Sequence, residues 1–201
     1  MPLTKIPQSQ LEDSAVGTTQ LADSAVTTAK LAANSVTAAK IPDGALTQAK
    51  MGAGVAGNGP AFSAFRNTSA QTVTSGVATK VQLNGEDFDT DNAFDSVTNF
   101  RFQPTVAGYY LVAGRIAASA SSGGTVSTPL IYKNGSLWLN GQPYIPPSGS
   151  SSMTTTVTGL VYLNGSTDYA ELWANITGAG TVTISNGTGI TFLQGTLVRA
   201  G

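Results

Sequence analysis

Three aspartates at alternate positions are the residues whose spacing most suggests chemistry. Asp87, Asp89 and Asp91 form a D-x-D-x-D run in the acidic stretch GEDFDTDNAFD. This spacing lets a loop wrap carboxylate oxygens around a calcium ion. The stretch is not an EF-hand, because Asn92 and Thr98 hold the positions of its turn glycine and its bidentate glutamate. Calcium is therefore the one candidate cofactor, and the alternative is a solvated acidic loop.

The composition argues against catalysis. The chain contains neither histidine nor cysteine. Ser-His-Asp and Cys-His arrangements are therefore impossible, and a zinc site would lack its usual ligands. Most carboxylates of residues 61–201 crowd into the one acidic stretch, whereas glycoside hydrolysis needs two that face each other across a cleft. The sequence predicts no catalytic residue and a protein that is not an enzyme.

Two aromatic residues are candidates for ligand contact. Trp138 and Tyr144 stand in NGSLWLNGQPYIPPSGSSS, a stretch rich in proline and serine that is typical of a loop. Exposed aromatic rings combine an apolar body with a polar atom, which suits stacking on a sugar. The alternative is that both residues pack. Trp173 alternates like a strand residue, and we expect it in the core or in a subunit interface.

Charge and hydropathy exclude two classes of partner. The net charge is −1 and charged residues make up 10% of the chain, against roughly 25% in ordinary globular proteins. Without a basic run, nucleic-acid binding has no source of counterion release. No stretch is apolar enough for a membrane span. The first seven residues carry no apolar segment of a secretory signal, so we expect a protein that reaches the outside as part of a particle.

The first quarter of the chain repeats every ten residues. LEDSAVGTTQ, LADSAVTTAK, LAANSVTAAK and IPDGALTQAK follow one another, and Met51 opens a fifth unit. One apolar residue opens each repeat and a second stands at its sixth position. These residues are Leu11, Val16, Leu21, Val26, Leu31, Val36, Ile41 and Leu46.

A five-residue apolar spacing fits neither regular element. On a helix, successive apolar residues would lie about 140° apart, and on a strand they would alternate between the two faces. Each repeat must therefore contain a turn, for which Asp-Ser-Ala and Asn-Ser are suitable. The Thr-Thr-Ala-Lys and Thr-Ala-Ala-Lys pieces favour a single capped helical turn.

Three chains around a common axis can bury what one repeat chain cannot. We therefore predict an extended trimeric stalk over residues 1–51, whose core is the apolar set above, with a disordered linker as the alternative. The glycine-rich residues 52–60, GAGVAGNGP, are predicted to form a hinge. Residues 61–201 are predicted to form a head.

The head shows short β signals separated by turns. Runs rich in Val, Ile, Thr, Tyr and Phe predict strands at 79–83, 109–117, 128–133, 155–163, 169–176, 181–185 and 190–198. The dipeptide Asn-Gly, a tight-turn sequence, recurs at residues 84, 134, 140, 164 and 186. No helical stretch intervenes, so the fold class is all-β, as a sandwich or jelly roll.

Several stretches of the head match one family pattern in order. They are AFSA at 61–64, AFD at 93–95, NFRFQP at 99–104, VAGYY at 106–110, LNGSTDY at 163–169 and FLQGTL at 192–197. Together they resemble the globular domain of complement component C1q and its tumour-necrosis-factor-like relatives. The sequence departs from the family at Phe94, where the family has Tyr, and in the two residues between Gly165 and Asp168. Residues 118–152 match poorly, and a partner-binding surface is expected to differ there.

The resemblance implies a ten-stranded jelly roll that assembles as a tight homotrimer about an axis shared with the stalk. It also implies that Asp95 has the structural role of the family's "YD" aspartate. Six aromatic residues would then belong to the core or the trimer interface. They are Phe62, Phe100, Phe102, Tyr109, Tyr110 and Phe192.

Decapeptide repeats before such a head look like those of bacteriophage fibre and appendage proteins. This resemblance implies a structural virion appendage on the particle surface, attached to a capsid or tail protein through its N-terminal segment. The outward head would contact a host-surface glycan or protein, or decorate the particle. The alternative is a soluble lectin-like or surface binding module with a calcium-dependent site.

Overall fold

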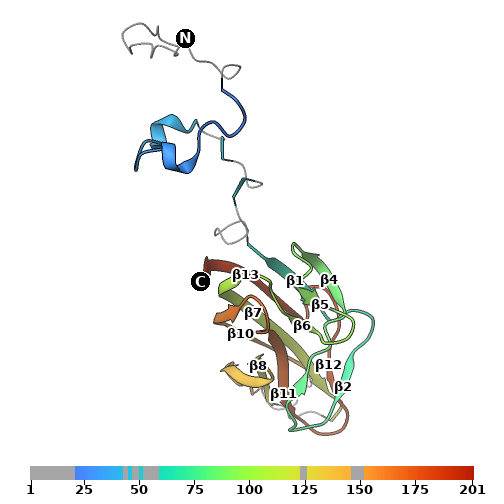
Figure 1. The fold of residues 1–201 in the computed structure, drawn as a ribbon. Helices are drawn as coiled ribbons and strands as arrows, with labels where there is room; N and C mark the ends of the chain where they lie inside the picture. Colours follow the sequence, from blue (N-terminus) through green and yellow to red (C-terminus); the bar gives the residue numbers. More distant parts are fainter. Residues whose placement is uncertain (1–20, 43–44, 47–49, 52–58, 123–125, 146–151) are drawn as a thin grey trace, which may run out of the picture. The chain divides into compact units, whose positions relative to one another are not determined.

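The computed structural model divides the chain into two compact units, Met1–Thr47 and Gln48–Gly201 (Figure 1). The structure describes residues 21–42, 45–46, 50–51, 59–122, 126–145 and 152–201. Within these residues, no helix has the length and apolar character needed to cross a membrane.

The repeats have a conformation that itself recurs every ten residues. Ser24 and Asn34 both have a φ of 63°, a left-handed conformation that Asn adopts more readily than most residues. Each is followed by one turn of 3₁₀ helix, η3 (Thr28–Lys30) and η4 (Ala38–Lys40). The expected turn and helical piece are thus present in each described repeat. The expected side-chain cap is not formed at η3, where the N-cap residue Thr27 makes no such hydrogen bond.

The lysines that close two repeats bond within their own chain. Lys30 Nζ donates to the carbonyl of Ala25 at 2.6 Å, and Lys40 Nζ donates to that of Ser35 at 2.7 Å. Each pair spans five residues, so the ammonium group closes the segment that contains the 3₁₀ turn of its repeat.

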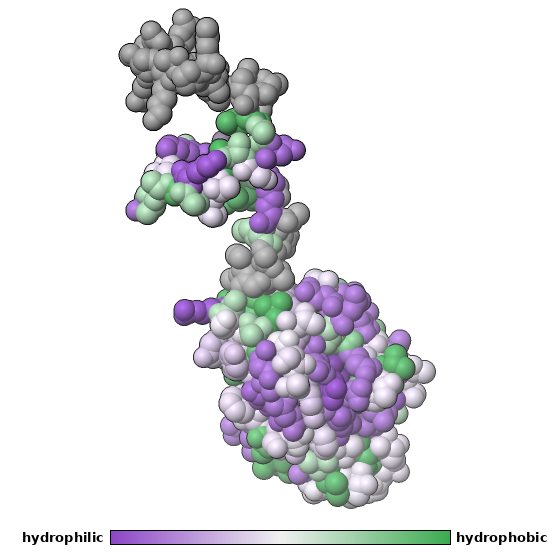
Figure 2. Space-filling model, in the orientation of Figure 1, coloured by the Kyte–Doolittle hydropathy of each residue, from purple (hydrophilic) through white to green (hydrophobic). Residues whose placement is uncertain are grey.

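The apolar residues of the repeats are largely exposed in a single chain, where Figure 2 shows hydrophobic side chains at the surface. Exposed fractions lie between 46% and 58% for Leu21, Val26, Leu31, Val36 and Leu46. Ile41 is half-buried. Leu11, Val16 and most of the predicted hinge at 52–60 lie outside the described residues. Within the described repeats, a single chain therefore leaves these five apolar side chains about half exposed to water.

The head is a sandwich of two antiparallel sheets. Sheet A has the order β2-β12-β7-β13-β1-β4, with β10 on the other edge of β7; sheet B has the order β5-β6-β11-β8-β9, with β3 also on β11. The strands of sheet A are β1 (Ala61–Phe65), β2 (Gln71–Val73), β4 (Gly85–Asp89), β7 (Ala107–Ala120), β10 (Ser152–Asn164), β12 (Val182–Ile184) and β13 (Phe192–Ala200). Those of sheet B are β3 (Thr79–Lys80), β5 (Phe94–Asp95), β6 (Arg101–Phe102), β8 (Val126–Lys133), β9 (Ser136–Asn140) and β11 (Ala170–Thr177).

Alternation of buried and exposed residues fixes the register of the long strands. In β10 the buried residues Met153, Thr155, Val157, Val161 and Leu163 alternate with exposed neighbours, as expected for a sheet with one face in the core. The all-β two-sheet sandwich is therefore confirmed. The described residues form thirteen strands rather than the implied ten, because several two- and three-residue strands pair at the edges.

The core is built on an aromatic cluster. Phe62 stacks on Phe94 and on Phe102, with ring centroids 5.3 and 4.1 Å apart. Tyr110 meets the Phe102 ring edge-on and donates its hydroxyl to the carbonyl of Val106 at 2.7 Å. Burial, with a further contribution from the charge of Asp91, raises the pKa of Tyr110 to about 12. The cluster therefore packs Phe62 and Tyr110 of sheet A against Phe94 and Phe102 of sheet B.

The Asn-Gly dipeptides have different conformations. Asn134 and Gly135 both have positive φ, 53° and 74°, which is the type I′ hairpin turn that joins β8 to β9. Gly85, in contrast, begins strand β4. Only the first of these two dipeptides is a hairpin turn, because only there do the flanking strands pair with each other.

Candidate binding pocket and assembly face

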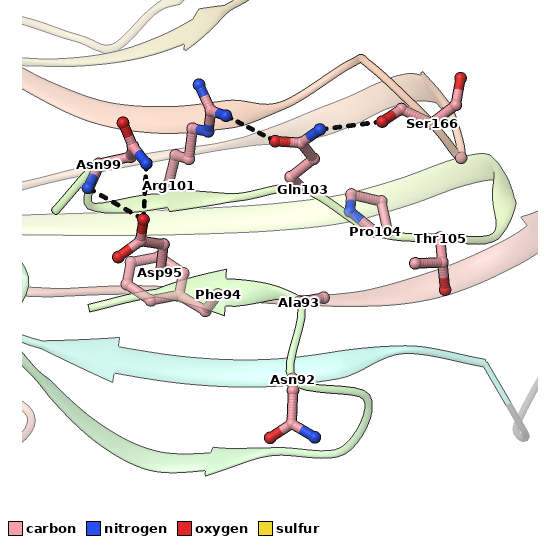
Figure 3. Close-up of a pocket in the computed structure, with 11 residues that line it drawn as sticks. Asn92, Ala93, Phe94, Asp95, Asn99, Arg101, Gln103, Pro104, Thr105 and Ser166 are labelled. Atoms are coloured by element: carbon pink, nitrogen blue, oxygen red, sulfur yellow. Dashed lines mark hydrogen bonds between the residues drawn. The ribbon is translucent and has the colours of Figure 1, made fainter. Parts of the chain in front are cut away.

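An open pocket of about 300 Å³ lies where the β5–β6 hairpin meets the loop between β10 and β11 (Figure 3). We name it the Arg101 pocket. Its lining is mostly polar and comes from Asn92, Ala93, Phe94, Asp95, Asn99, Arg101, Gln103, Pro104, Thr105, Gly165 and Ser166.

Strand alternation places two polar side chains at the pocket. Phe102 is fully buried in the core, whereas its neighbours Arg101 and Gln103 are half-buried. Residues two apart on an extended chain share a face. The sequence NFRFQP therefore directs its aromatic ring inward and its guanidinium and amide groups toward the pocket.

The guanidinium group of Arg101 is held in place from two sides. Its Nη2 donates to Gln103 Oε1 at 2.7 Å, and Gln103 Nε2 donates to the carbonyl of Ser166 at 2.9 Å (Figure 3). Its Cζ lies 4.3 Å from the ring centroid of Tyr169, a cation–π contact. The ion pairs within the described ranges are Lys80–Glu171 and Lys133–Asp168, so Arg101 has no carboxylate partner there.

Asp95 organises the turn that follows β5. Its carboxylate accepts hydrogen bonds from the backbone N–H groups of Val97, Thr98 and Asn99 at 3.0, 2.8 and 3.1 Å, and from Asn99 Nδ2 at 2.6 Å. The hydrogen bond from Thr98, followed by those from Val97 and Asn99, lowers the pKa of Asp95 to about 2 although burial opposes the shift. The Asp95 carboxylate is therefore already hydrogen-bonded to N–H groups of its own turn.

The opposite wall is a loop ordered by one asparagine. Asn164 Oδ1 accepts from the backbone N–H groups of Ser166, Thr167 and Asp168 at 3.0, 2.9 and 2.9 Å. Between them, Gly165 has a φ of 70°, and a Cβ there would lie 2.4 Å from the backbone nitrogen of Ala107. Only glycine fits this position, which sets the direction of the loop toward the pocket.

The three aspartates of the D-x-D-x-D run have separate partners. Asp87 lies at a β-bulge between β1 and β4 and accepts from Ser63 Oγ at 3.0 Å. Asp89 accepts from the backbone N–H of Phe94 at 2.7 Å, and Asp91 accepts from Thr90 Oγ1 at 2.8 Å. Across the described part of the chain, no three Asp, Glu, His or Cys residues gather as metal ligands. These contacts do not bring the three carboxylates together as ligands of one ion, and the calcium site stays a prediction.

The predicted aromatic contact residues are both at the surface. Trp138 is 51% exposed on β9, and its Nε1 donates to the carbonyl of Leu160 at 3.4 Å. Tyr144 is 43% exposed and pairs with Ser127 of β8 through both backbone groups. Trp173 is half-buried on the outer side of β11, where it stacks on Tyr132 with ring centroids 4.4 Å apart.

The outer side of sheet A carries a broad set of exposed apolar residues, which we name the assembly face. Leu111 pairs with Leu160 between β7 and β10. A second, largely apolar hollow of about 230 Å³ connects Leu111 to Phe88 across β13 and β1. The assembly face consists of Phe88, Tyr109, Leu111, Leu160 and Tyr162, which are 39–55% exposed.

The remaining aromatic candidates divide between core and surface. Phe62, Phe102 and Tyr110 are buried in the core, and Tyr109 belongs to the assembly face. Phe192 is half-buried at the start of β13. Phe100 is half-buried with a φ of 50°, and it precedes β6.

The sequence did not identify Arg101 and Gln103 as site residues, although a signal was present. Both polar residues alternate with Phe100 and Phe102 in NFRFQP. Such alternation predicts that they share the face opposite the core. The sequence could not show that the loop at Gly165 and Ser166, which comes from a distant part of the chain, lies at the pocket.

Comparisons with known proteins identify the fold. No family model matches the sequence, and a search of curated proteins finds no match either. Among solved structures, Eiger TNF from S. frugiperda aligns with a TM-score of 0.52 at 11% identity, over 71% of this chain and 93% of that one. Murine APRIL aligns with a TM-score of 0.50 at 12% identity, over 68% and 96% of the two chains.

The globular domain of zebrafish complement 1qA aligns at 17% identity over 71% of this chain and 98% of that one, with a TM-score of 0.48. The two higher-scoring alignments cover 71% and 68% of this chain. The head therefore has the jelly-roll fold of the C1q and tumour-necrosis-factor type.

Proposed function

We propose that the protein is a homotrimeric binding appendage in which the assembly face packs against neighbouring copies of the same chain. The observation that carries this proposal is the exposure of Leu111, Leu160 and Tyr162 on one face of a sheet. Contiguous apolar surface of this kind marks interaction sites. A second copy of the chain is the occupant, because the stalk needs the same partner.

The stalk supports a symmetric assembly independently of the head. Val26 and Val36 are each 54% exposed in a single chain and recur with the ten-residue period. Chains wound around one axis would bury these residues in successive layers, as in other repeat structures in which each unit is stabilised by its neighbours. Both the stalk and the head therefore expose apolar residues that further copies of the same chain would cover.

We further propose that the appendage belongs to a virion. The support is the resemblance of the decapeptide repeats to those of bacteriophage fibres and the placement of a binding-type fold after them. In this role residues 1–51 attach the trimer to a capsid or tail protein. The head faces outward, where it contacts a host-surface glycan or protein or decorates the particle. This role is non-enzymatic.

Two experiments test these proposals separately. Size-exclusion chromatography with mass detection on the full chain is expected to give three times the chain mass, and a monomer would refute the assembly. Gold-labelled antibody against the head, imaged on intact particles, is expected to mark the particle surface. Particles that lack the protein and still adsorb normally to host cells would refute the attachment role while leaving decoration in place.

A soluble lectin-like module is the second candidate, favoured by one observation. Trp138 is half exposed beside Lys133, whose Nζ lies 5.7 Å from its ring centroid, and such a surface suits stacking with a sugar. A glycan array probed with and without calcium tests it. Binding by free trimers, with no particle association, would favour this candidate over the virion appendage.

A further inference from the structure

Arg101 is a cation at the wall of a polar pocket without an ion-pair partner in the described part of the chain. Charged side chains in such positions usually have a partner, because leaving a partly buried charge unpaired is costly. Of its five N–H donors, one donates to Gln103 Oε1, and no hydrogen bond within the described residues engages the other four. We propose that the Arg101 pocket binds the carboxylate of a sugar acid.

The guanidinium group is arranged before any ligand arrives. Tyr169 covers one face of it, and Gln103, itself tethered to the carbonyl of Ser166, fixes one edge. The planar fork of an arginine held in this way matches the two oxygens of a carboxylate, and such charge-assisted pairs are stronger than neutral hydrogen bonds. Little side-chain entropy remains to be lost on binding.

The other charged group of the pocket does not compete for Arg101. Asp95 lies opposite Arg101 in the antiparallel register of β5 and β6. Its two oxygens, however, accept four N–H groups of its own turn. Figure 3 shows the two polar systems as separate, with Asp95 directed to Asn99 and Arg101 directed to Gln103. The pocket therefore offers one available positive charge, which favours a singly charged carboxylate over a phosphate.

The remaining lining suits hydroxyl groups. Thr105, Asn92 and Ser166 bring hydroxyl and amide groups to the wall, while Pro104 and Ala93 add apolar surface. The volume of about 300 Å³ lies at the lower end of the range for small-molecule sites, ~300–1,000 Å³, and favours one sugar ring over a long chain. A sugar acid combines the single negative charge with the hydroxyls.

This inference rests on the proposal that the head is a binding module, and it names the chemistry of its ligand. The pocket shares no lining residue with the assembly face. Assembly and ligand binding can therefore be measured and can fail independently.

The test is calorimetric titration of the full chain with sodium glucuronate, glucose and glucose 6-phosphate. We expect glucuronate to bind and glucose to bind about 10- to 100-fold more weakly, which is the effect of losing hydrogen bonds to a charged group. Equal binding of glucose and glucuronate would overturn the proposal, as would tighter binding of glucose 6-phosphate or no binding of glucuronate.

Variants locate the site. R101Q is expected to weaken glucuronate binding about 10- to 100-fold, whereas the matched control R199Q removes the same charge from an exposed residue of β13 and is expected to leave it unchanged. Thr105→Val, at an exposed position, is expected to weaken binding about 2- to 10-fold and keeps the test valid if R101Q misfolds. Unchanged binding in R101Q and Thr105→Val would refute the pocket. A monomer that still binds glucuronate would refute only the assembly.

Discussion

Tyr109 on β7 and Tyr162 on β10 lie directly opposite each other, with ring centroids 5.3 Å apart and planes at 60°. Both rings are at the surface of a single chain, 48% and 39% exposed. Edge-to-face pairing fixes the two rings against each other and presents them as one rigid surface beside Leu111 and Leu160. A rigid apolar surface is what a tight subunit contact requires.

A charge in the assembly face is expected to dissociate the trimer. Leu160→Glu would place a carboxylate in a surface that becomes dry on association, and burying an unpaired charge is strongly unfavourable. We expect sedimentation analysis to show monomers with an unchanged β-sheet circular dichroism spectrum. Ile145→Glu is the control, because Ile145 is 73% exposed and lies outside the face. A trimer that survives Leu160→Glu would place the contact elsewhere.

Polar substitutions in the repeats are expected to loosen the stalk alone. Changing Leu21, Val26, Leu31 and Val36 to Ser removes the apolar layers that partner chains would cover. Limited proteolysis should then cleave within residues 21–40 at least tenfold faster, since cleavage follows the population of the open chain, while the head stays intact. Thr27→Ser with Thr37→Ser is the matched control. Equal cleavage rates would indicate a linker rather than a stalk.

The sequence predicted the long strands better than the site. Alternation places β7, β10 and β13 within a few residues, because each has one face in the core. The short strands β5 and β6 were missed as separate elements, since two residues carry no periodicity. The pocket was missed because it depends on Gly165, whose loop reaches Arg101 across more than sixty positions of sequence and is directed by tertiary contacts.

The acidic stretch shows a second limit of sequence reasoning. Asp87 and Asp89 are two apart, which on a regular strand would put them on one face. The β-bulge at this point breaks the register between β1 and β4, and the two carboxylates have separate partners, Ser63 for Asp87 and the backbone of Asp91 and Phe94 for Asp89. Spacing alone does not reveal a bulge, and the sequence pattern of a metal loop is therefore compatible with hydrogen-bonded turns.

Removing the Asp95 carboxylate is expected to destabilise the head in a pH-dependent way. Asp95→Asn should lower the free energy of unfolding at neutral pH by about 1–2 kcal/mol, as for hydrogen bonds to a charged group. Because the pKa of Asp95 is lowered from 3.8 to about 2, the unfolded chain takes up the proton first as the pH falls. The stabilisation is therefore present above pH 4 and is lost between about pH 4 and pH 2.

Urea unfolding of both proteins at pH 6 and near pH 2 measures this effect. The difference between wild type and Asp95→Asn should shrink toward acid. A difference that is constant over this range would contradict the role of the charge.

The buried Glu171 is expected to be the most sensitive ionised residue of the head. It is 2% exposed, forms an ion pair with Lys80 and accepts from Trp173 Nε1 at 2.9 Å. Glu171→Ala removes the ion-pair partner of Lys80 and leaves the Trp173 indole N–H without its acceptor, and we expect a loss of about 2–3 kcal/mol in chemical denaturation. Glu171→Gln keeps an acceptor for the indole and should lose less. Equal losses would show that the hydrogen bond to Trp173 contributes nothing.

Calcium is expected to have no effect on thermal stability. Asp89 already accepts two backbone N–H groups, those of Asp91 and Phe94, so binding a cation would have to break the loop's own hydrogen bonds. We expect the same melting temperature in millimolar calcium and in chelator. A calcium-dependent rise that disappears in Asp91→Asn would instead establish a metal site in this loop.

The conformational repeat of the stalk has a consequence for its evolution. Ser24 and Asn34 mark equivalent points ten residues apart, each followed by the same 3₁₀ turn and the same lysine bond. Duplication or deletion of one whole unit in the gene keeps every later apolar residue in phase with its neighbours. An insertion that is not a whole number of units shifts the repeated turn out of phase. Length can therefore change in fixed steps while the head and its ligand preference are inherited unaltered.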